Sequence, residues 1–201
     1  MYKMNVTLSN LVERKTLTKQ DATLIEDELR LRGNMIVFGQ VGGGKTTILE
    51  AIIKSCLEQY PKNKHIYIPV YKEMDFSAES SIEVLQQSNS SIAALAAVAV
   101  KKNADTIFIE EIRTHQDLLA IEFLMKLGKQ VIFTIHAATT SALQDKLRML
   151  LLPSEDNSVV KSFEYILDQL NMLIHAEYVP IGQYKLSLSK TDELNRVTHS
   201  R

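Results

Sequence analysis

The feature that most constrains this chain is a cluster of glycines, because four of its 7 glycines lie between Gly39 and Gly44. The cluster follows the apolar run Met35–Phe38 and leads directly into Lys45 and Thr46. This order fits G-x-x-x-x-G-K-[ST] between a buried strand and a helix, a motif whose backbone amides surround phosphate oxygens. Glycines suit such a loop because side chains would obstruct the phosphate. The sequence therefore predicts a phosphate-binding loop rather than an ordinary flexible turn.

Each part of this loop has an expected role. The helix expected over Thr46–Tyr60 presents its positive dipole end to the phosphates. Lys45 can reach the β- and γ-phosphates, and the hydroxyl of Thr46 can ligate Mg²⁺. The residues predicted to bind the phosphates are Gly39, Gln40, Val41, Gly42, Gly43, Gly44, Lys45, Thr46 and Thr47.

Apolar strands alternate with helices along most of the chain, which is typical of βαβ units and a mainly parallel sheet. Strands are expected at Met35–Phe38, His65–Val70, Thr106–Ile109 and Gln130–Ile135, and further helices at Ser91–Lys102, His115–Leu127 and Thr139–Leu152. Thr18 and Asp21 form a capping pattern that starts an earlier helix, and Gly33 ends it. Residues 1–17 show no clear pattern, and Phe76–Ser90 is expected to be mainly a loop.

The pattern changes after Pro153, where a helix over Val159–Leu170 is followed by a hairpin of Leu173–Val179 and Gln183–Leu188. We therefore expect an α/β fold in three parts. Residues 1–33 form an N-terminal segment with a lead-in helix, residues 34–152 form the core, and residues 153–201 form a C-terminal helix, hairpin and polar tail.

Composition excludes several classes of protein. The net charge of −1 over 201 residues disfavours a strongly basic nucleic-acid binder. The single cysteine, Cys56, excludes a disulfide framework and a four-cysteine zinc site, and its surroundings indicate a buried helical position. The longest clean apolar stretch, Ile92–Val100, is far shorter than the ~20 residues of a membrane span. No signal peptide is recognised, so we expect a soluble intracellular protein.

Two acids, Glu110 and Glu111, follow the apolar strand Thr106–Ile109 at its carboxyl end. In an open α/β sheet, side chains at this end point into the ligand crevice. One acid can hold a magnesium-bound water, and the other can orient or deprotonate an attacking water. Because consecutive strand residues face opposite ways, the two acids are not expected to share one role. The alternative is an acid pair that only caps the next helix.

His136 ends the next strand at the same edge of the sheet. There it could hydrogen-bond a γ-phosphate or the water that attacks the phosphate. On position alone, a purely structural role for this histidine is also an open alternative. The other histidines, His65, His115, His175 and His199, have no spacing that suggests a metal site.

Three separated motifs together resemble the type II/type IV secretion ATPase superfamily, which powers secretion systems, pilus assembly and retraction, and conjugation. GQVGGGKTT is similar to its phosphate loop, and DTIFIEEIR, which ends at Arg113, is similar to its acidic box. Thr134–Ala137 (TIHA), followed by Ala142, Leu147 and Arg148, resembles its histidine box. The resemblance spans Leu17–Leu152 and implies a RecA-like P-loop NTPase core.

By position, the resemblance makes Glu111 the catalytic acid and Arg113 the arginine that follows the acidic box. It makes His136 the box histidine and so a functional residue. Glu110 stands where the family usually has glycine, and we keep it as a candidate both for catalysis and, with Thr46, for binding Mg²⁺.

Three departures from the family pattern stand out. A second acidic box is matched only in part, with Glu73 and Asp75 as candidates beside the alternative of ordinary surface acids. No arginine lies between Arg32 and Arg113. The first strand of the sheet is expected to begin at Met35. The family has a full domain before this strand, so we expect a truncated form that lacks most of the N-terminal domain.

The resemblance implies a P-loop ATPase that binds and hydrolyses MgATP as the motor of a secretion, pilus or conjugation system. It implies a hexameric ring beneath a membrane platform protein, cytoplasmic and peripheral to the inner face of the cell membrane. Direct sequence-specific nucleic-acid binding is not expected. A non-hydrolysing nucleotide-binding assembly subunit is one alternative. Another P-loop enzyme, such as a nucleoside kinase, is the second, and the arginine gap disfavours it.

Overall fold

The computed structural model of the chain describes residues 6–70, 74, 76, 79–87, 90–151, 164–179 and 183–190. The helices are α1 (Leu8–Glu13), α2 (Lys19–Arg30), α3 (Lys45–Gln59), α4 (Ile92–Lys101), α5 (His115–Lys126) and α6 (Thr140–Leu151), and residues 164–169 are also helical. The strands are β1 (Asn34–Gly39), β2 (His65–Ile68), β3 (Ile82–Val84), β4 (Thr106–Ile112), β5 (Gln130–His136), β6 (Leu170–Val179) and β7 (Gln183–Lys190).

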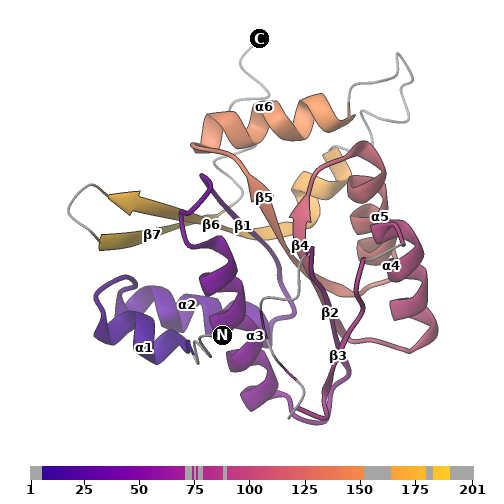
Figure 1. Cartoon of the computed structure of the whole chain (residues 1–201), viewed down its shortest axis with the longest axis horizontal. Coiled ribbons are helices and arrows are strands. Elements are labelled where there is room, and N and C mark those ends of the chain that lie inside the picture. The colour runs from indigo at the N-terminus through magenta and orange to yellow at the C-terminus, as the bar shows by residue number, and fades with distance from the viewer. Residues whose placement is uncertain are drawn as a thin grey trace.

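The strands of the described residues form one sheet in the order β3-β2-β4-β5-β1-β6-β7 (Figure 1). All neighbouring strands are parallel except β6 and β7, which pair antiparallel. This is the mainly parallel α/β fold that the sequence predicts. The carboxyl ends of β1, β4 and β5 therefore meet at one edge of the sheet.

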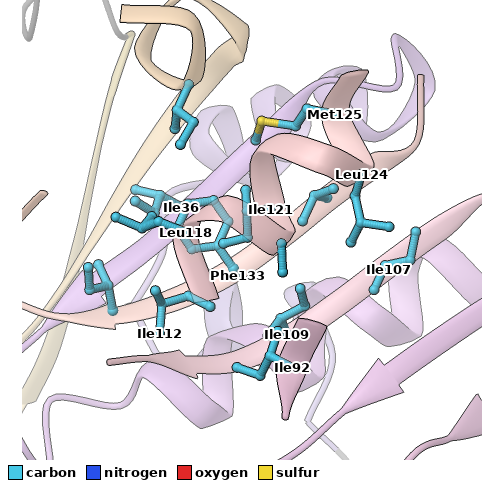
Figure 2. Close-up of a cluster of buried hydrophobic side chains, with 14 of the residues drawn as sticks. Ile36, Ile92, Ile107, Ile109, Ile112, Leu118, Ile121, Leu124, Met125 and Phe133 are labelled. Atoms are coloured by element: carbon cyan, nitrogen blue, oxygen red, sulfur yellow. The ribbon is translucent and has the colours of Figure 1, made fainter. Parts of the chain in front are cut away.

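Helices cover both faces of this sheet, which explains why its central strands are apolar without interruption. One face packs on α1, α2 and α3 through side chains such as Met35 and Val37 of β1. The other packs on α4, α5 and α6, and Figure 2 shows Leu118 and Ile121 of α5 in the same cluster as Ile109 of β4. The two cores hold β4 and β5 rigidly between the layers, so their ends are well placed to carry a site.

The helix starts predicted from capping residues are confirmed. The hydroxyl of Thr18 accepts the amide of Asp21 at 3.1 Å at the start of α2. Ser91 caps α4 in the same way through the amide of Ala94. Gly128, with φ 68°, follows α5 in the left-handed conformation that ends helices.

Four elements differ from the sequence prediction. The helix α1 was not predicted, because six residues are too few to show a helical period. The strand β3 lies in the segment expected to be a loop, and its three residues include the polar Glu83. The strand β4 continues past Ile109 to Ile112 and so contains both acids.

The fourth difference is β6, which begins at Leu170, inside the segment expected to be helical. Asn171 looks like a turn residue, but its Oδ1 accepts the amide of Asn34 at 2.9 Å across a register shift between β1 and β6. The rest of the expected helix, over residues 159–163, lies outside the described residues, as does the turn at residues 180–182. Among the described residues, no helix is both long enough and apolar enough to cross a bilayer.

The cap of α2 makes a stability prediction. Thr18→Ala should lower the free energy of unfolding by about 1 kcal/mol, because it removes the acceptor for the Asp21 amide. Chemical denaturation measures this. Thr23→Ala is the matched control within the same helix, where the threonine hydroxyl bonds the Lys19 carbonyl. Because alanine is the better helix former, this control should leave stability unchanged or raise it by about 0.5 kcal/mol. Equal losses in both variants would contradict the cap.

Candidate functional site

The predicted phosphate loop forms the turn between β1 and α3. Gly44 is the N-cap of α3 and has φ 93°, a left-handed conformation that glycine adopts without strain. Because glycine has no side chain with which to cap a helix, the first amides of α3 are directed out of the helix without a side-chain cap. A helix N-terminus in this state is suited to an anion.

The loop packs closely against the β6–β7 hairpin. A side chain at Gly39 would collide with the carbonyl of Ala176 in β6, and one at Gly44 would lie 3.2 Å from the ring of Tyr184 in β7. These glycines therefore allow the loop to touch the hairpin as well as leaving space for a phosphate. Nothing in the spacing of the hairpin residues indicates this contact, so sequence reasoning missed it.

Lys45 reaches back into its own loop. Its Nζ donates to the carbonyl oxygens of Gly39 at 3.1 Å and Gln40 at 2.8 Å. Burial lowers the pKa of Lys45, and the negative charges of Glu111 and Glu110 partly oppose that shift. The ammonium thus sits at the loop and interacts with both acids, and phosphate oxygens can replace its two carbonyl partners there.

Glu110 is 7% exposed and is surrounded by donors. Thr46 donates its hydroxyl to Oε1 at 2.9 Å, and Tyr67 of β2 donates its hydroxyl to Oε2 at 3.0 Å. The amide of Val70, just beyond β2, also donates to Oε2 at 3.3 Å. Glu110 and Thr46 are therefore brought together as predicted, while Tyr67 and Val70 were missed, because neither belongs to a recognisable motif.

The two acids do not sit on a regular strand. The strand β4 shifts register against β5 between Ile109 and Ile112, so Glu110 and Glu111 both lie opposite Thr134. Glu111 has φ 56°, and its amide donates to the hydroxyl of Thr134 at 2.8 Å. The expectation that the acids face opposite ways assumed regular alternation, and this bulge breaks the alternation. Their partners nevertheless differ.

Glu111 is paired with Arg113 two residues later. The guanidinium donates to Oε2 of Glu111 at 2.6 Å, and the carboxylate is only one third exposed. This hydrogen bond lowers the pKa of Glu111, with smaller contributions from the charges of Lys45 and His136. The acid is therefore ionised at neutral pH and carries its own counter-charge.

His136 ends β5 next to the phosphate loop. Its Nδ1 lies 2.8 Å from the carbonyl oxygen of Gly39. Because a carbonyl can only accept, Nδ1 carries a proton, and in the neutral ring Nε2 is left as an acceptor. His136 also interacts with Glu111, so the predicted histidine does lie at the site.

Two cavities lie beside the loop on its hairpin side. One, of about 360 Å³, lies between the loop and the hairpin and is lined by Gln40, Val41, Gly42, Gly43, Ala138, His175, Ala176, Glu177, Tyr178 and Tyr184. The other, of about 200 Å³, reaches α1 and is lined by Leu11, Arg14, Thr16, Gly43, Gly44, Thr47, Ile48, Tyr184 and Leu186. A third cavity, of about 430 Å³, lies on the side of β5 and is lined by Gln40, Val41, His136, Ala137 and Ala138. A fourth cavity, of about 390 Å³, lies at the amino ends of β2 and β3, away from the predicted residues.

Some candidates lie elsewhere. Glu73 and Asp75 fall outside the described residues. Cys56 is buried in α3 beside His65, and burial raises the pKa of its thiol to about 12, in keeping with a structural role. Within the described part of the chain, no three His, Cys, Asp or Glu side chains are grouped to hold a metal ion.

Comparison with known proteins adds to this geometry. The family model described as Type II/IV secretion system protein matches residues 1–176. The conjugal transfer protein TrbB of Rhizobium radiobacter is 23% identical over 145 residues, which cover 72% of this chain and 45% of that protein. The chain spans about half the length of the curated relatives it matches.

Solved structures show the same fold. The VirB11 ATPase from the Brucella suis type IV secretion system, crystallised with sulphate, matches with a TM-score of 0.74 and 16% identity, covering 94% of this chain and 59% of that one. The Legionella pneumophila ATPase DotB matches with a TM-score of 0.73 and 18% identity, covering 96% of this chain and 52% of that one. The fold is therefore the RecA-like P-loop core that the sequence predicts. Because the family match runs from residue 1 to residue 176, and so includes the loop, β4 and β5, this chain belongs to the Type II/IV secretion system protein family.

Proposed function

We propose that this chain binds ATP with Mg²⁺ at the carboxyl edge of its sheet and hydrolyses it to drive a secretion, pilus or conjugation system. The observation that supports this most strongly is the convergence of Lys45, Glu110, Glu111 and His136 beside one loop. Lys45 would bind phosphate, Glu110 would lie on the side of the metal ion, and Glu111 would act on the attacking water. His136 is a polar group that could contact the γ-phosphate or that water.

The loop would hold the phosphates. The uncapped amides at the start of α3 and the backbone of residues 39–47 would donate to the phosphate oxygens. Lys45 would exchange the carbonyls of Gly39 and Gln40 for β- and γ-phosphate oxygens. Its lowered pKa arises mainly from burial, and a phosphate beside the ammonium would favour the charged form again.

The residues present suit a magnesium ion. Mg²⁺ prefers hard oxygen donors and keeps several of its waters. The Thr46 hydroxyl and the Glu110 carboxylate are such donors, and they are already joined at 2.9 Å. When bound, the ion would supply positive charge against the phosphates. Tyr67 would keep the carboxylate oriented through its hydroxyl.

The cavity of about 200 Å³ beside the loop is suited to the base of the nucleotide. It combines the apolar side chains of Leu11 and Ile48 with the ring of Tyr184 and the polar Arg14 and Thr16. A flat aromatic base can pack on the apolar wall and the ring, while the polar groups contact its edge or the ribose.

Glu111 would polarise the attacking water, since the carboxylate is ionised and near Lys45. In the described state it is engaged by Arg113, whose guanidinium is half exposed. For hydrolysis, Arg113 would release the acid and turn to the developing charge on the phosphate. His136 can accept a hydrogen bond through Nε2, and the attacking water could supply that hydrogen bond.

We extend the proposal to the assembly that the family resemblance implies. Copies of the chain would form a hexameric ring that works against a membrane platform protein, on the cytoplasmic side of the membrane. The site is open on one side, because Val41 at the tip of the loop is 83% exposed. A neighbouring chain could therefore complete the phosphate end of the site.

One observation favours the non-hydrolysing alternative. The ion pair of Glu111 with Arg113, at 2.6 Å, occupies the acid that hydrolysis would need. A protein that binds MgATP but shows no turnover at any protein concentration would support that alternative. Membership of the secretion family argues against the nucleoside kinase.

Lys45→Ala should weaken the binding of MgATP about tenfold or more, because charged hydrogen bonds to phosphate contribute about 1.5–3 kcal/mol. Its stability without nucleotide should change by no more than about 1 kcal/mol, since the two freed carbonyls can return to water. Titration calorimetry and chemical denaturation measure the two effects. Lys62→Ala, an exposed lysine just before β2 at the opposite edge, is the control and should bind normally. Normal binding by Lys45→Ala would exclude the phosphate loop.

Glu111→Gln should keep MgATP binding and slow hydrolysis by about 100-fold or more, because it removes the charge that polarises water while preserving size. Glu110→Gln should instead raise the Mg²⁺ concentration needed for half-maximal activity, because the Glu110 carboxylate is proposed to help hold the ion. Steady-state phosphate release at varied Mg²⁺ separates the two. If Glu111→Gln is active and Glu110→Gln is inactive, the proposed roles of the two acids must be exchanged.

A further inference from the structure

The β-bulge at the end of β4 explains how Glu111 comes to face the site. Ile109 pairs with Phe133 and Ile112 pairs with Ile135, so two residues of β4 oppose the single residue Thr134 of β5. A bulge of this kind inserts one extra residue and leaves one backbone group out of the ladder. In this case the extra residue lies within the acidic pair.

The side chains on either side of the bulge reveal its effect. In a regular strand, residues three apart point to opposite faces. Ile109 and Ile112 are three apart, yet both are fully buried in the cluster under α4 and α5, where Figure 2 shows them with Leu118. The extra residue is therefore accommodated between them. Without it, Ile112 would have to exchange its buried apolar environment for the opposite face.

The bulge places the backbone of Glu111 in a strained conformation. Its φ of 56° is in the left-handed region, which residues other than glycine seldom adopt. Its amide lies within the register shift, where the pairing of β4 with β5 is interrupted. The hydroxyl of Thr134 accepts this amide at 2.8 Å, and Thr134 is only 2% exposed.

We propose that Thr134 is a positioning residue, whose hydroxyl holds the bulge open so that the carboxylate of Glu111 faces Lys45. The inference rests on the proposed function, in which Glu111 polarises the attacking water. Thr134 touches neither phosphate nor water in this role. It acts through the amide of Glu111, and its removal would let the bulge shift along β4 and misplace the acid.

The first test needs no turnover. In the nucleotide-free protein, amide hydrogen exchange followed by NMR should show the Glu111 amide protected. Thr134→Val, which keeps the shape but removes the acceptor, should speed its exchange about tenfold or more relative to neighbouring amides, and Thr134→Ser should not. Thr106→Val is the matched control, because Thr106 is equally buried at the other end of β4 and bonds Gln130 at 2.9 Å. Unchanged exchange in Thr134→Val would overturn the inference.

The second test separates positioning from packing by kinetics. Thr134→Val should lower kcat about tenfold or more with KM for MgATP nearly unchanged, because a small misplacement of a reacting group is costly. Thr134→Ser should restore most of kcat, and Thr106→Val should lower the melting temperature but not kcat. If Thr134→Val folds too poorly to assay, the smaller Thr134→Ala takes its place. An equal loss of kcat in Thr106→Val would mean that packing alone explains the effect, and would overturn the inference.

A double mutant connects the two residues. If Thr134 acts only through Glu111, then Glu111→Gln with Thr134→Val should be no slower than Glu111→Gln alone. If the double variant loses kcat by the product of the two single losses, the inference is overturned. A fully active Glu111→Gln would instead show that the proposed function has the wrong acid, while the exchange experiment would still decide whether Thr134 holds the bulge.

Discussion

The arrangement of the site depends on one buried carboxylate, that of Glu110. A charge with 7% exposure is tolerated only where hydrogen-bond donors surround it, and here three segments supply them. Thr46 donates from α3, Tyr67 from β2 and Val70 from the backbone that follows β2. One carboxylate thus fixes the phosphate loop, the end of β4 and the exit from β2 at a common point. An acid at this position therefore supports the loop in addition to any role in its chemistry.

A second constraint comes from the other side of the loop. The sheet order places β1 between β5 and β6, so the loop leaves β1 with His136 on one side and the β6–β7 hairpin on the other. The hairpin touches the loop so closely that a side chain at Gly39 would collide with the carbonyl of Ala176, and one at Gly44 would lie 3.2 Å from the ring of Tyr184. The glycines of the loop therefore suit two purposes, since they would expose amides to a phosphate and they let β6 and β7 form a wall beside the loop.

Much of this could be predicted from the sequence. The loop, the alternation of strands and helices and the acids at the end of β4 all depend on local patterns, and local patterns are visible in one chain. The bulge at Glu111 could not be predicted, because it requires knowing that Ile109 and Ile112 share one core. Tyr67, Thr134 and the hairpin contact were missed for a related reason. Their roles depend on which residue lies across the sheet, and no spacing along the chain records that.

The central claim is that the phosphates of MgATP bind over the loop between β1 and α3, with Lys45 and Thr46 in contact. A crystal structure with Mg²⁺ and a non-hydrolysable ATP analogue tests it most directly. We expect the Nζ of Lys45 to have left the carbonyls of Gly39 and Gln40 for the β- and γ-phosphates, with the ion beside Thr46 and Glu110. Phosphates bound elsewhere, for example in the cavity at the amino ends of β2 and β3, with Lys45 still on its two carbonyls, would contradict the account.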